Sequence, residues 1–358
     1  MRMLYEHIVI RSPARALAIL KTLEKSQLSD GTSLQAIHYG QWTRHVEVYT
    51  FTRGSRDVSY LEAIFKILNY CPNLQILSGH WTHKLPNEFF DAIARRLGPS
   101  LSSLYWNELD TSFLHTNKSA ANPTFLGSFR SLRVLDLRHI VGSEPSTWVE
   151  ESRPALPQVT HLILSTREES LAFATFLLLP SLRNLTMKPE VLGARPDDFI
   201  KSFLKAHGAS LTFVDLRKPS KDGLSDFQIS RLGFSLSRHV PPDLFLDPQN
   251  CPNLESFAFP AHSPEVTVSS PSLRRIGLRG AHMDTLYPDK PSSLREHLLS
   301  IDVKKFPRLE SILTINFLVE SHTDSLIKDI FIWWVERFAE MGVDFLDGEG
   351  VLWVYTDP

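Results

Sequence analysis

Two stretches decide how this chain folds: Leu132-Arg133-Val134-Leu135-Asp136-Leu137 and Leu182-Arg183-Asn184-Leu185-Thr186-Met187. Both follow the frame Leu-x-x-Leu-x-Leu, with a methionine in the last place of the second copy. Further copies begin at Leu74, Leu101, Val159, Leu211, Leu254, Leu273 and Leu309, and a degenerate first copy consists of Val46, Tyr49 and Phe51. The six starts from Leu74 to Leu211 are 23 to 31 residues apart, and the later steps are irregular. This spacing is close to the roughly 20–29 residue period of known strand-and-helix arrays.

The frame has a physical reason. Alternate side chains of a strand point to opposite faces, so Leu135 and Leu137 point into the same core, as do Leu162 and Leu164. Each buried leucine contributes about 1.5–3 kcal/mol. A single repeat cannot cover its own leucines, so a neighbouring repeat must do so. The pattern therefore predicts stacked parallel strands.

Amphipathic segments lie between the frames and are expected to be helices. In the first of them, Leu61, Ile64, Phe65 and Leu68 recur with the helical period of 3.6 residues. The expected helices are Asp57 to Tyr70, Glu88 to Leu97, Arg167 to Leu178, Asp197 to His207 and Ser292 to Ile301. Strand-plus-helix units at this period predict an α/β fold, an irregular leucine-rich-repeat solenoid with a curved parallel sheet and helices on its convex side.

The whole chain, 1–358, is expected to be one such domain, capped at both ends. Residues 1–45 form the expected N-terminal cap, with a helix from Ser12-Pro13 to about Lys25. Residues 46–315 hold about ten repeats. Residues 321–358 form the C-terminal cap, a helix starting near Thr323 and then a hairpin around an Asp347-Gly348 turn.

Composition excludes several classes of protein. The chain is 42% hydrophobic and 22% charged, which is ordinary for a globular protein, and its formal net charge of -2 favours neither nucleic acid nor an anionic membrane. Glu6 and His7 interrupt the first apolar run, so no secretory signal is expected, and the longest apolar run is far shorter than the roughly 20 residues of a membrane helix. We expect an intracellular monomer, cytoplasmic or nuclear, that binds neither membranes nor nucleic acid.

The two cysteines occupy the same tetrapeptide, Cys71-Pro72-Asn73-Leu74 and Cys251-Pro252-Asn253-Leu254. A shared local context predicts equivalent buried positions in which cysteine acts as a small hydrophobe. A disulfide between them is the disfavoured alternative, because stacked repeats would hold such distant units apart.

The sequence contains no motif that indicates catalysis: neither a Gly-x-Ser-x-Gly elbow, a phosphate-binding glycine-rich loop nor His-Glu-x-x-His. His80 and His83 lack further zinc ligands at defined spacing, and the acidic residues around Asp347 lack the twelve-residue calcium pattern. We therefore expect no enzyme activity, no cofactor and no metal.

The repeat instead predicts a binding surface, since side chains that flank the core leucines should line the concave face. The candidate partner-binding residues are Tyr105, Asp136, Arg138, His161, Lys188, Asp215, Arg217 and Arg279. One row of these residues is basic and consists of Arg138, Lys188, Arg217 and Arg279. This row suggests a partner with acidic or phosphorylated groups. In the alternative interpretation, this face is solvated and its charges pair with each other across adjacent strands.

With its repeats placed, the chain resembles the leucine-rich-repeat region of fungal F-box proteins, especially the mushroom-type families. The resemblance rests on Leu4-Tyr5-Glu6-His7-Ile8-Val9-Ile10 before Ser12-Pro13-Ala14-Arg15-Ala16-Leu17, on the Cys-Pro-Asn-Leu openings, and on Gly342-Val343-Asp344-Phe345-Leu346-Asp347 before Trp353. It implies that the repeats recruit a substrate protein for ubiquitination. The alternative is a free-standing leucine-rich-repeat scaffold unconnected to ubiquitin.

In that family, an F-box normally precedes the Leu-Tyr segment and docks the ligase adaptor. The present chain starts at about the point where an F-box would end, so an adaptor and a cullin are expected only if an F-box exists upstream. Leu85-Pro86-Asn87-Glu88 is similar to the opening of an F-box helix. It lies inside the repeat array, however, and is expected to begin a repeat helix.

Overall fold

The computed structural model describes residues 5–28, 38–50, 58–82, 85–108, 121–143, 145–189, 197–219, 239–320 and 322–354. Its strands form a twelve-stranded sheet in which the order of the strands equals their order in the chain. The chain divides into two compact units, residues 1–182 and residues 183–358. The expected α/β fold with parallel strands is confirmed.

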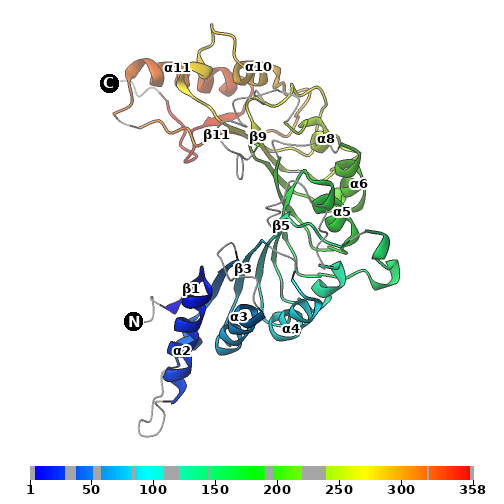
Figure 1. Ribbon diagram of the computed structural model, residues 1–358. Helices are drawn as coiled ribbons and strands as arrows, with labels where there is room; N and C mark the ends of the chain where they lie inside the picture. The colour runs from blue at the N-terminus through cyan, green and yellow to red at the C-terminus, as the bar shows by residue number, and fades with distance from the viewer. Residues whose placement is uncertain are drawn as a thin grey trace, which may run out of the picture. The chain divides into compact units, whose positions relative to one another are not determined.

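Among the described residues, the first unit contains six parallel strands and the helices that follow them. The strands are β1 (His7–Ile10), β2 (His45–Tyr49), β3 (Ile76–Trp81), β4 (Ser103–Glu108), β5 (Val134–His139) and β6 (His161–Ser165). The α-helices are α2 (Pro13–Leu28), α3 (Val58–Tyr70), α4 (Asn87–Leu97) and α5 (Glu168–Phe176), and the 3-10 turns are η1 (Tyr39–Trp42), η2 (Pro123–Ser128), η3 (Pro145–Thr147) and η4 (Glu150–Ser152). Figure 1 shows α2, α3 and α4 along one face of these strands.

The second unit repeats this plan. Its strands are β7 (Asn184–Lys188), β8 (Phe213–Leu216), β9 (Ser256–Pro260), β10 (Arg275–Arg279), β11 (Ser311–Ile315) and β12 (Asp344–Leu346), and the pairings are parallel. Its helices are α6 (Asp197–His207), η5 (Gly208–Ser210), α8 (Asp243–Leu246), α9 (Met283–Leu286), α10 (Ser293–Ser300) and α11 (Ser325–Ala339). The labelled helices again lie on one face of the strands (Figure 1).

The frame leucines form the core between sheet and helices. Leu77, Leu104, Leu135 and Leu162 stand opposite one another in register, and each is completely buried. Burial of each of these side chains stabilises the fold by about 1.5–3 kcal/mol. The row as a whole offsets a substantial part of the conformational entropy lost when the four strands become ordered. The leading residue is buried as well, and the strand begins two residues after it, as with Leu132 and Val134.

The two Cys-Pro-Asn-Leu segments have the same local structure. Cys71 and Cys251 are buried and unpaired, so the prediction of equivalent apolar positions is confirmed and the disulfide alternative is not observed. Asn73 donates a hydrogen bond to the carbonyl of Gln41 (2.9 Å), and Asn253 donates one to the carbonyl of Ala209 (2.7 Å). Burial raises the pKa of the Cys71 thiol to about 11 and that of the Cys251 thiol to about 12, so both are unreactive at neutral pH.

The N-terminal segment differs from the expected cap, because β1 is itself the first strand of the sheet. The first repeat also has a different register. Val46 pairs with Leu77, which makes Val46 the second residue of its frame rather than the first. The first place is taken by Thr43, which is fully buried and donates a hydrogen bond to the carbonyl of Tyr5 (2.9 Å). Because the leading residue is threonine, a search for leucine frames does not find this repeat in its observed register.

The C-terminal segment also differs from expectation. The helix α11 is capped by Asp324 rather than Thr323, since the Asp324 side chain accepts from the amide of Leu326 (2.9 Å). The expected hairpin is wrong: β12 pairs in parallel with β11, and the described residues 351–354 form no strand. The Asp347 carboxylate accepts from the amides of Glu349 and Val351, which holds this segment as a loop.

None of the helices in the described part of the chain is both long enough and apolar enough to cross a bilayer.

Candidate functional site

The sheet face away from the helices, here called the open face, carries a row of four polar side chains and one isoleucine in the first unit. Glu47, Ser78, Tyr105, Asp136 and Ile163 stand opposite one another on β2 to β6. Each is flanked along its strand by core residues, as Tyr105 is by the buried Leu104 and Trp106. Strand alternation therefore directs this row to the open face.

Asp136 of this row forms a tight ion pair with Arg138, two residues later on β5. The Arg138 guanidinium donates to Asp136 through Nε (2.9 Å to Oδ1) and Nη2 (2.6 Å to Oδ2), and the Arg138 amide also donates to Oδ1 (3.1 Å). Asp136 is only 4% exposed. Such a bidentate pair fixes the orientation of the guanidinium plane. Tyr105 stands directly opposite Asp136, and burial, followed by the Asp136 charge, raises the pKa of its phenol.

A second group of polar side chains lies on β1, β2 and β3. The rings of His7 and His45 stack at 4.1 Å, and those of Tyr49 and His80 stack at 4.5 Å. The Glu47 carboxylate lies between the pairs: it accepts a hydrogen bond from the Tyr49 hydroxyl and lies 3.4 Å from His7 Nε2 and 3.7 Å from His80 Nε2. We call these five residues the His–Tyr–Glu group.

The histidines of this group are held by further contacts. His45 Nε2 lies 2.9 Å from the Ser78 hydroxyl, and Asn107 donates to His80 Nδ1 (3.2 Å). Burial is the main cause that lowers the pKa of both His45 and His80. Both imidazoles are therefore mainly neutral at neutral pH and act as hydrogen-bonding groups rather than as cations.

In the second unit the charged residues converge on one carboxylate. Asp215 is 2% exposed and accepts from Arg279 through Nε (2.8 Å) and Nη2 (3.1 Å). Arg217 Nε lies 2.7 Å from Oδ2 of the same carboxylate, the oxygen that also accepts from Arg279 Nη2. The Arg217 amide donates to the carbonyl of Met187 (2.8 Å), which places Arg217 beside Lys188 at the end of β7. One buried carboxylate is thus shared by two guanidiniums.

These positions show how the expected partner-binding residues are distributed. Tyr105, Asp136 and Arg138 lie together in the first unit, with His161 half-buried on the next strand. The others, Lys188, Asp215, Arg217 and Arg279, lie in the second unit. The aspartates are covered by arginines, so the charge pairing that was the alternative interpretation is present. Asp136 pairs with Arg138, and Asp215 with Arg217, at two-residue spacing along the chain. Asp215 also pairs with Arg279 on β10, beyond the adjacent strand β9.

Sequence reasoning missed most of the His–Tyr–Glu group. His7 lies on a strand that was expected to belong to a cap, and the first repeat was placed out of register. The signal was present in the alternation of Ile8 with Ile10 and of Val46 with Val48, all of which are buried.

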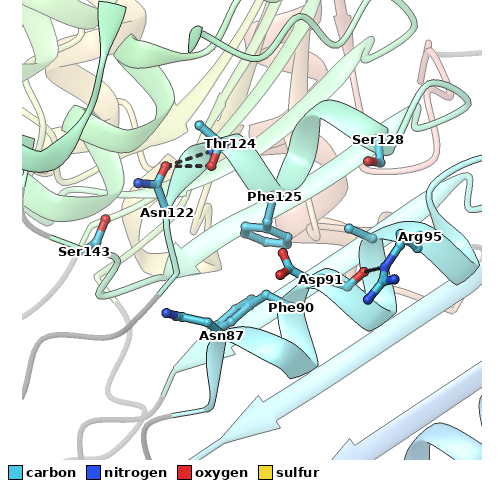
Figure 2. A pocket seen from close by; sticks show the side chains of 10 residues that line it. Asn87, Phe90, Asp91, Arg95, Asn122, Thr124, Phe125, Ser128 and Ser143 are labelled. Atoms are coloured by element: carbon cyan, nitrogen blue, oxygen red, sulfur yellow. Dashed lines mark hydrogen bonds between the residues drawn. The ribbon is translucent and has the colours of Figure 1, made fainter.

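The helix side of the first unit carries a separate hollow of about 700 Å³ between α4 and η2. Figure 2 shows Phe90 and Phe125 side by side, with ring centroids 5.2 Å apart, and Asn122 accepting from the amide and hydroxyl of Thr124. Asp91 and Arg95 are the only charged residues among the ten that line it. The Arg95 Nε donates to the backbone carbonyl of Asp91 (3.2 Å), one turn earlier in α4.

No group of three or more potential metal ligands occurs among the described residues. His80 is part of the His–Tyr–Glu group, while its suggested companion His83 lies outside the described residues. No model of a known protein family matches the chain, and a search of curated proteins finds no relative.

Proposed function

We propose that this chain is a protein-recognition module that binds a partner protein on the open face of its sheet. The observation that carries the proposal is the rigid arrangement of polar side chains on that face. Arg138, Tyr49 and His80 are each held by neighbouring side chains, so little side-chain entropy is lost when a partner docks. Tyrosine and arginine are also the residue types that dominate binding energy at protein interfaces.

The charges of the face suggest how a partner is recognised. In the first unit, the Arg138 charge is balanced by Asp136, so recognition there depends on hydrogen bonds and on aromatic contacts. In the second unit, Arg217 and Arg279 share Asp215, which leaves an excess of positive charge. In this proposal, an acidic segment of the partner therefore binds to the second unit.

The proposal extends to a biological role: the chain is the substrate-binding part of an F-box-type ubiquitin ligase receptor, built from irregular leucine-rich repeats. The resemblance of the Leu4 to Leu17 segment and of the Cys-Pro-Asn-Leu openings to fungal F-box proteins supports this role. The regular stacking of frame leucines supports the repeat assignment.

Affinity purification of the native polypeptide that contains this chain, followed by quantitative mass spectrometry, tests the role. A receptor is expected to co-purify with a ligase adaptor and a cullin in addition to its substrate. Recovery of a binding protein without adaptor and cullin would replace the receptor by a free-standing repeat scaffold. Recovery of no specific binding protein would contradict the recognition function itself.

A further inference from the structure

The strand β1 forms one edge of the sheet, since among the described residues it pairs with β2 alone. The carbonyl of Glu6 points toward β2, because it accepts from the amides of Arg44 (2.9 Å) and His45 (3.1 Å). Peptide groups of successive strand residues point to opposite sides, so those of His7 and Val9 point away from β2. Two N–H and two C=O groups therefore face outward, and in the part of the chain that the structure describes no hydrogen bond engages them.

A hollow of about 250 Å³ lies beside this edge, between β1 and α2. We call it the edge groove. Figure 1 shows β1 at the outer end of the first unit, with α2 next to it. The residues of α2 that line the groove are mainly apolar and comprise Arg15, Ala18, Ile19, Thr22 and Leu23. The outward main-chain groups of β1 and a largely apolar helix wall thus lie side by side.

The charge of the helix wall is positive. Arg15 is the only lysine, arginine, aspartate or glutamate among the nine residues that line the edge groove. Its side chain is exposed and forms no ion pair with any residue in the described ranges. The further charged residues of α2 are Lys21 and Lys25, both exposed, and a single acid, Glu24. This excess of positive charge attracts a ligand that carries carboxylates.

We propose that a partner protein adds an extended acidic segment to the β1 edge as a further strand. Its main chain bonds to His7 and Val9, an apolar side chain fills the edge groove against Ile19, and a carboxylate pairs with Arg15. Strand addition of this kind takes affinity from main-chain hydrogen bonds and specificity from side-chain pockets. A second copy of the chain fits less well, because two cationic α2 helices would approach each other.

The β1 edge is separate from the open face, so this proposal stands whether or not that face binds a protein. The two are tested by different variants, because Ile163 lies on β6 and Val9 on β1.

Selection of a random eight-residue peptide library on the full chain, followed by fluorescence polarisation of the enriched peptides, tests the edge. We expect enriched peptides in which apolar residues alternate with others and which contain aspartate or glutamate. Val9→Pro should weaken their binding by about tenfold or more, because the outward N–H is lost and the ring blocks the approaching backbone. Val9→Thr is the matched control, since it keeps both the N–H and the branched shape, and should bind as the wild type does.

Two variants of α2 test the groove wall without changing β1. Ile19→Asp should weaken binding by about tenfold, because it places a carboxylate against the acidic peptide, whereas Leu17→Asp should not. Leu17 is 60% exposed on the same helix and does not line the edge groove. Arg15→Glu should likewise weaken binding, and its control Lys21→Glu should change it little. Circular dichroism shows whether each variant is folded.

Amide hydrogen exchange distinguishes strand addition from simple occupation of the groove. The amides of His7 and Val9 should exchange more slowly when the peptide is bound, while those of Ile8 and Ile10, which face β2, should change little. The proposal is overturned if no acidic peptide is enriched, if folded Val9→Pro binds as well as Val9→Thr, or if exchange at His7 and Val9 is unchanged. A dimer that Val9→Pro dissociates, without peptide binding, would assign the edge to a second copy and overturn it as well.

Discussion

Asp215 illustrates how a buried charge is tolerated in this sheet. Its carboxylate is almost fully covered and holds Arg217 and Arg279. We expect Asp215→Asn to lower the free energy of unfolding by about 2–3 kcal/mol, because the two guanidiniums would lose their negatively charged partner. The loss should be smaller than for a fully buried pair, because the Arg217 side chain remains 42% exposed.

Urea denaturation of the wild type and of Asp215→Asn measures this difference in the free energy of unfolding. Asp198→Asn is the matched control, because the Asp198 side chain is 99% exposed and its nearest cation, Lys201, lies at 4.0 Å. If both variants unfold at the wild-type midpoint, the shared carboxylate is not a stabilising feature.

His297 links stability to pH. It is 3% exposed, its Nε2 lies 3.0 Å from the carbonyl of Ser263, and burial is the largest cause that lowers its pKa. The hydrogen bond to Ser263 and the charge of Glu265 oppose this shift, whereas His262 adds to it. The folded state therefore keeps His297 neutral while the unfolded state binds a proton below about pH 6.5.

Stability should accordingly be fully present above pH 6.5 and should fall as the pH decreases toward the lower pKa of the folded state. Denaturation midpoints between pH 7.5 and pH 5 are expected to fall less steeply in His297→Gln than in the wild type. The control is His322→Gln, at a side chain that is 82% exposed. Equal slopes in the wild type and His297→Gln would contradict the assignment.

Two glycines, in η1 and η5, lie against the backbone just before a Cys-Pro-Asn-Leu opening. A Cβ at Gly40 would lie 1.9 Å from the carbonyl oxygen of Tyr70, and one at Gly208 would lie 2.1 Å from that of Asn250. Because neither oxygen belongs to a flexible side chain, Gly40→Ala and Gly208→Ala should each destabilise the fold by about 1–3 kcal/mol. Thermal unfolding should show no comparable loss for Gly127→Ala, whose nearest neighbour would be at 3.8 Å.

The strands were predictable wherever a leucine frame was complete. The leading leucines at 132 and 182 each lie two residues before an observed strand, because alternation and burial act over a few neighbouring residues. The prediction failed at β1 and at the first repeat, where a polar Thr43 occupies the leading position. It failed also at residues 351–354, because the pairing of β12 with β11 depends on residues more than thirty positions away.

The candidate site was predictable only in outline. The two-residue spacing of Asp136 and Arg138 is local, and the sequence placed both on one face. The pairing of Asp215 with Arg279 joins residues 64 positions apart, and no local pattern encodes it. The approach of Lys218 Nζ to the backbone of Gly280 likewise joins residues far apart in the chain. Such contacts follow from the order of the strands in the sheet.

The ion pairs of Arg138 with Asp136 and of Arg217 with Asp215 also determine how the proposed binding function should be tested in the intact protein. Reversing the charge of Arg138 or Arg217 would place two carboxylates together, so loss of binding in such a variant would be confused with unfolding. Ile163 is a better position, because it stands beside Asp136 on the open face, is only half-buried, and lies outside the ion pair.

The most direct test of the binding face is quantitative affinity purification with Ile163→Arg and its matched control Val58→Arg, an aliphatic residue of α3 that is 66% exposed on the helix side. Circular dichroism should show that both variants are folded. We expect Ile163→Arg to lose most of the partner protein that the wild type retains, whereas Val58→Arg keeps it. Equal recovery of that protein by the wild type and a folded Ile163→Arg would contradict binding on the open face.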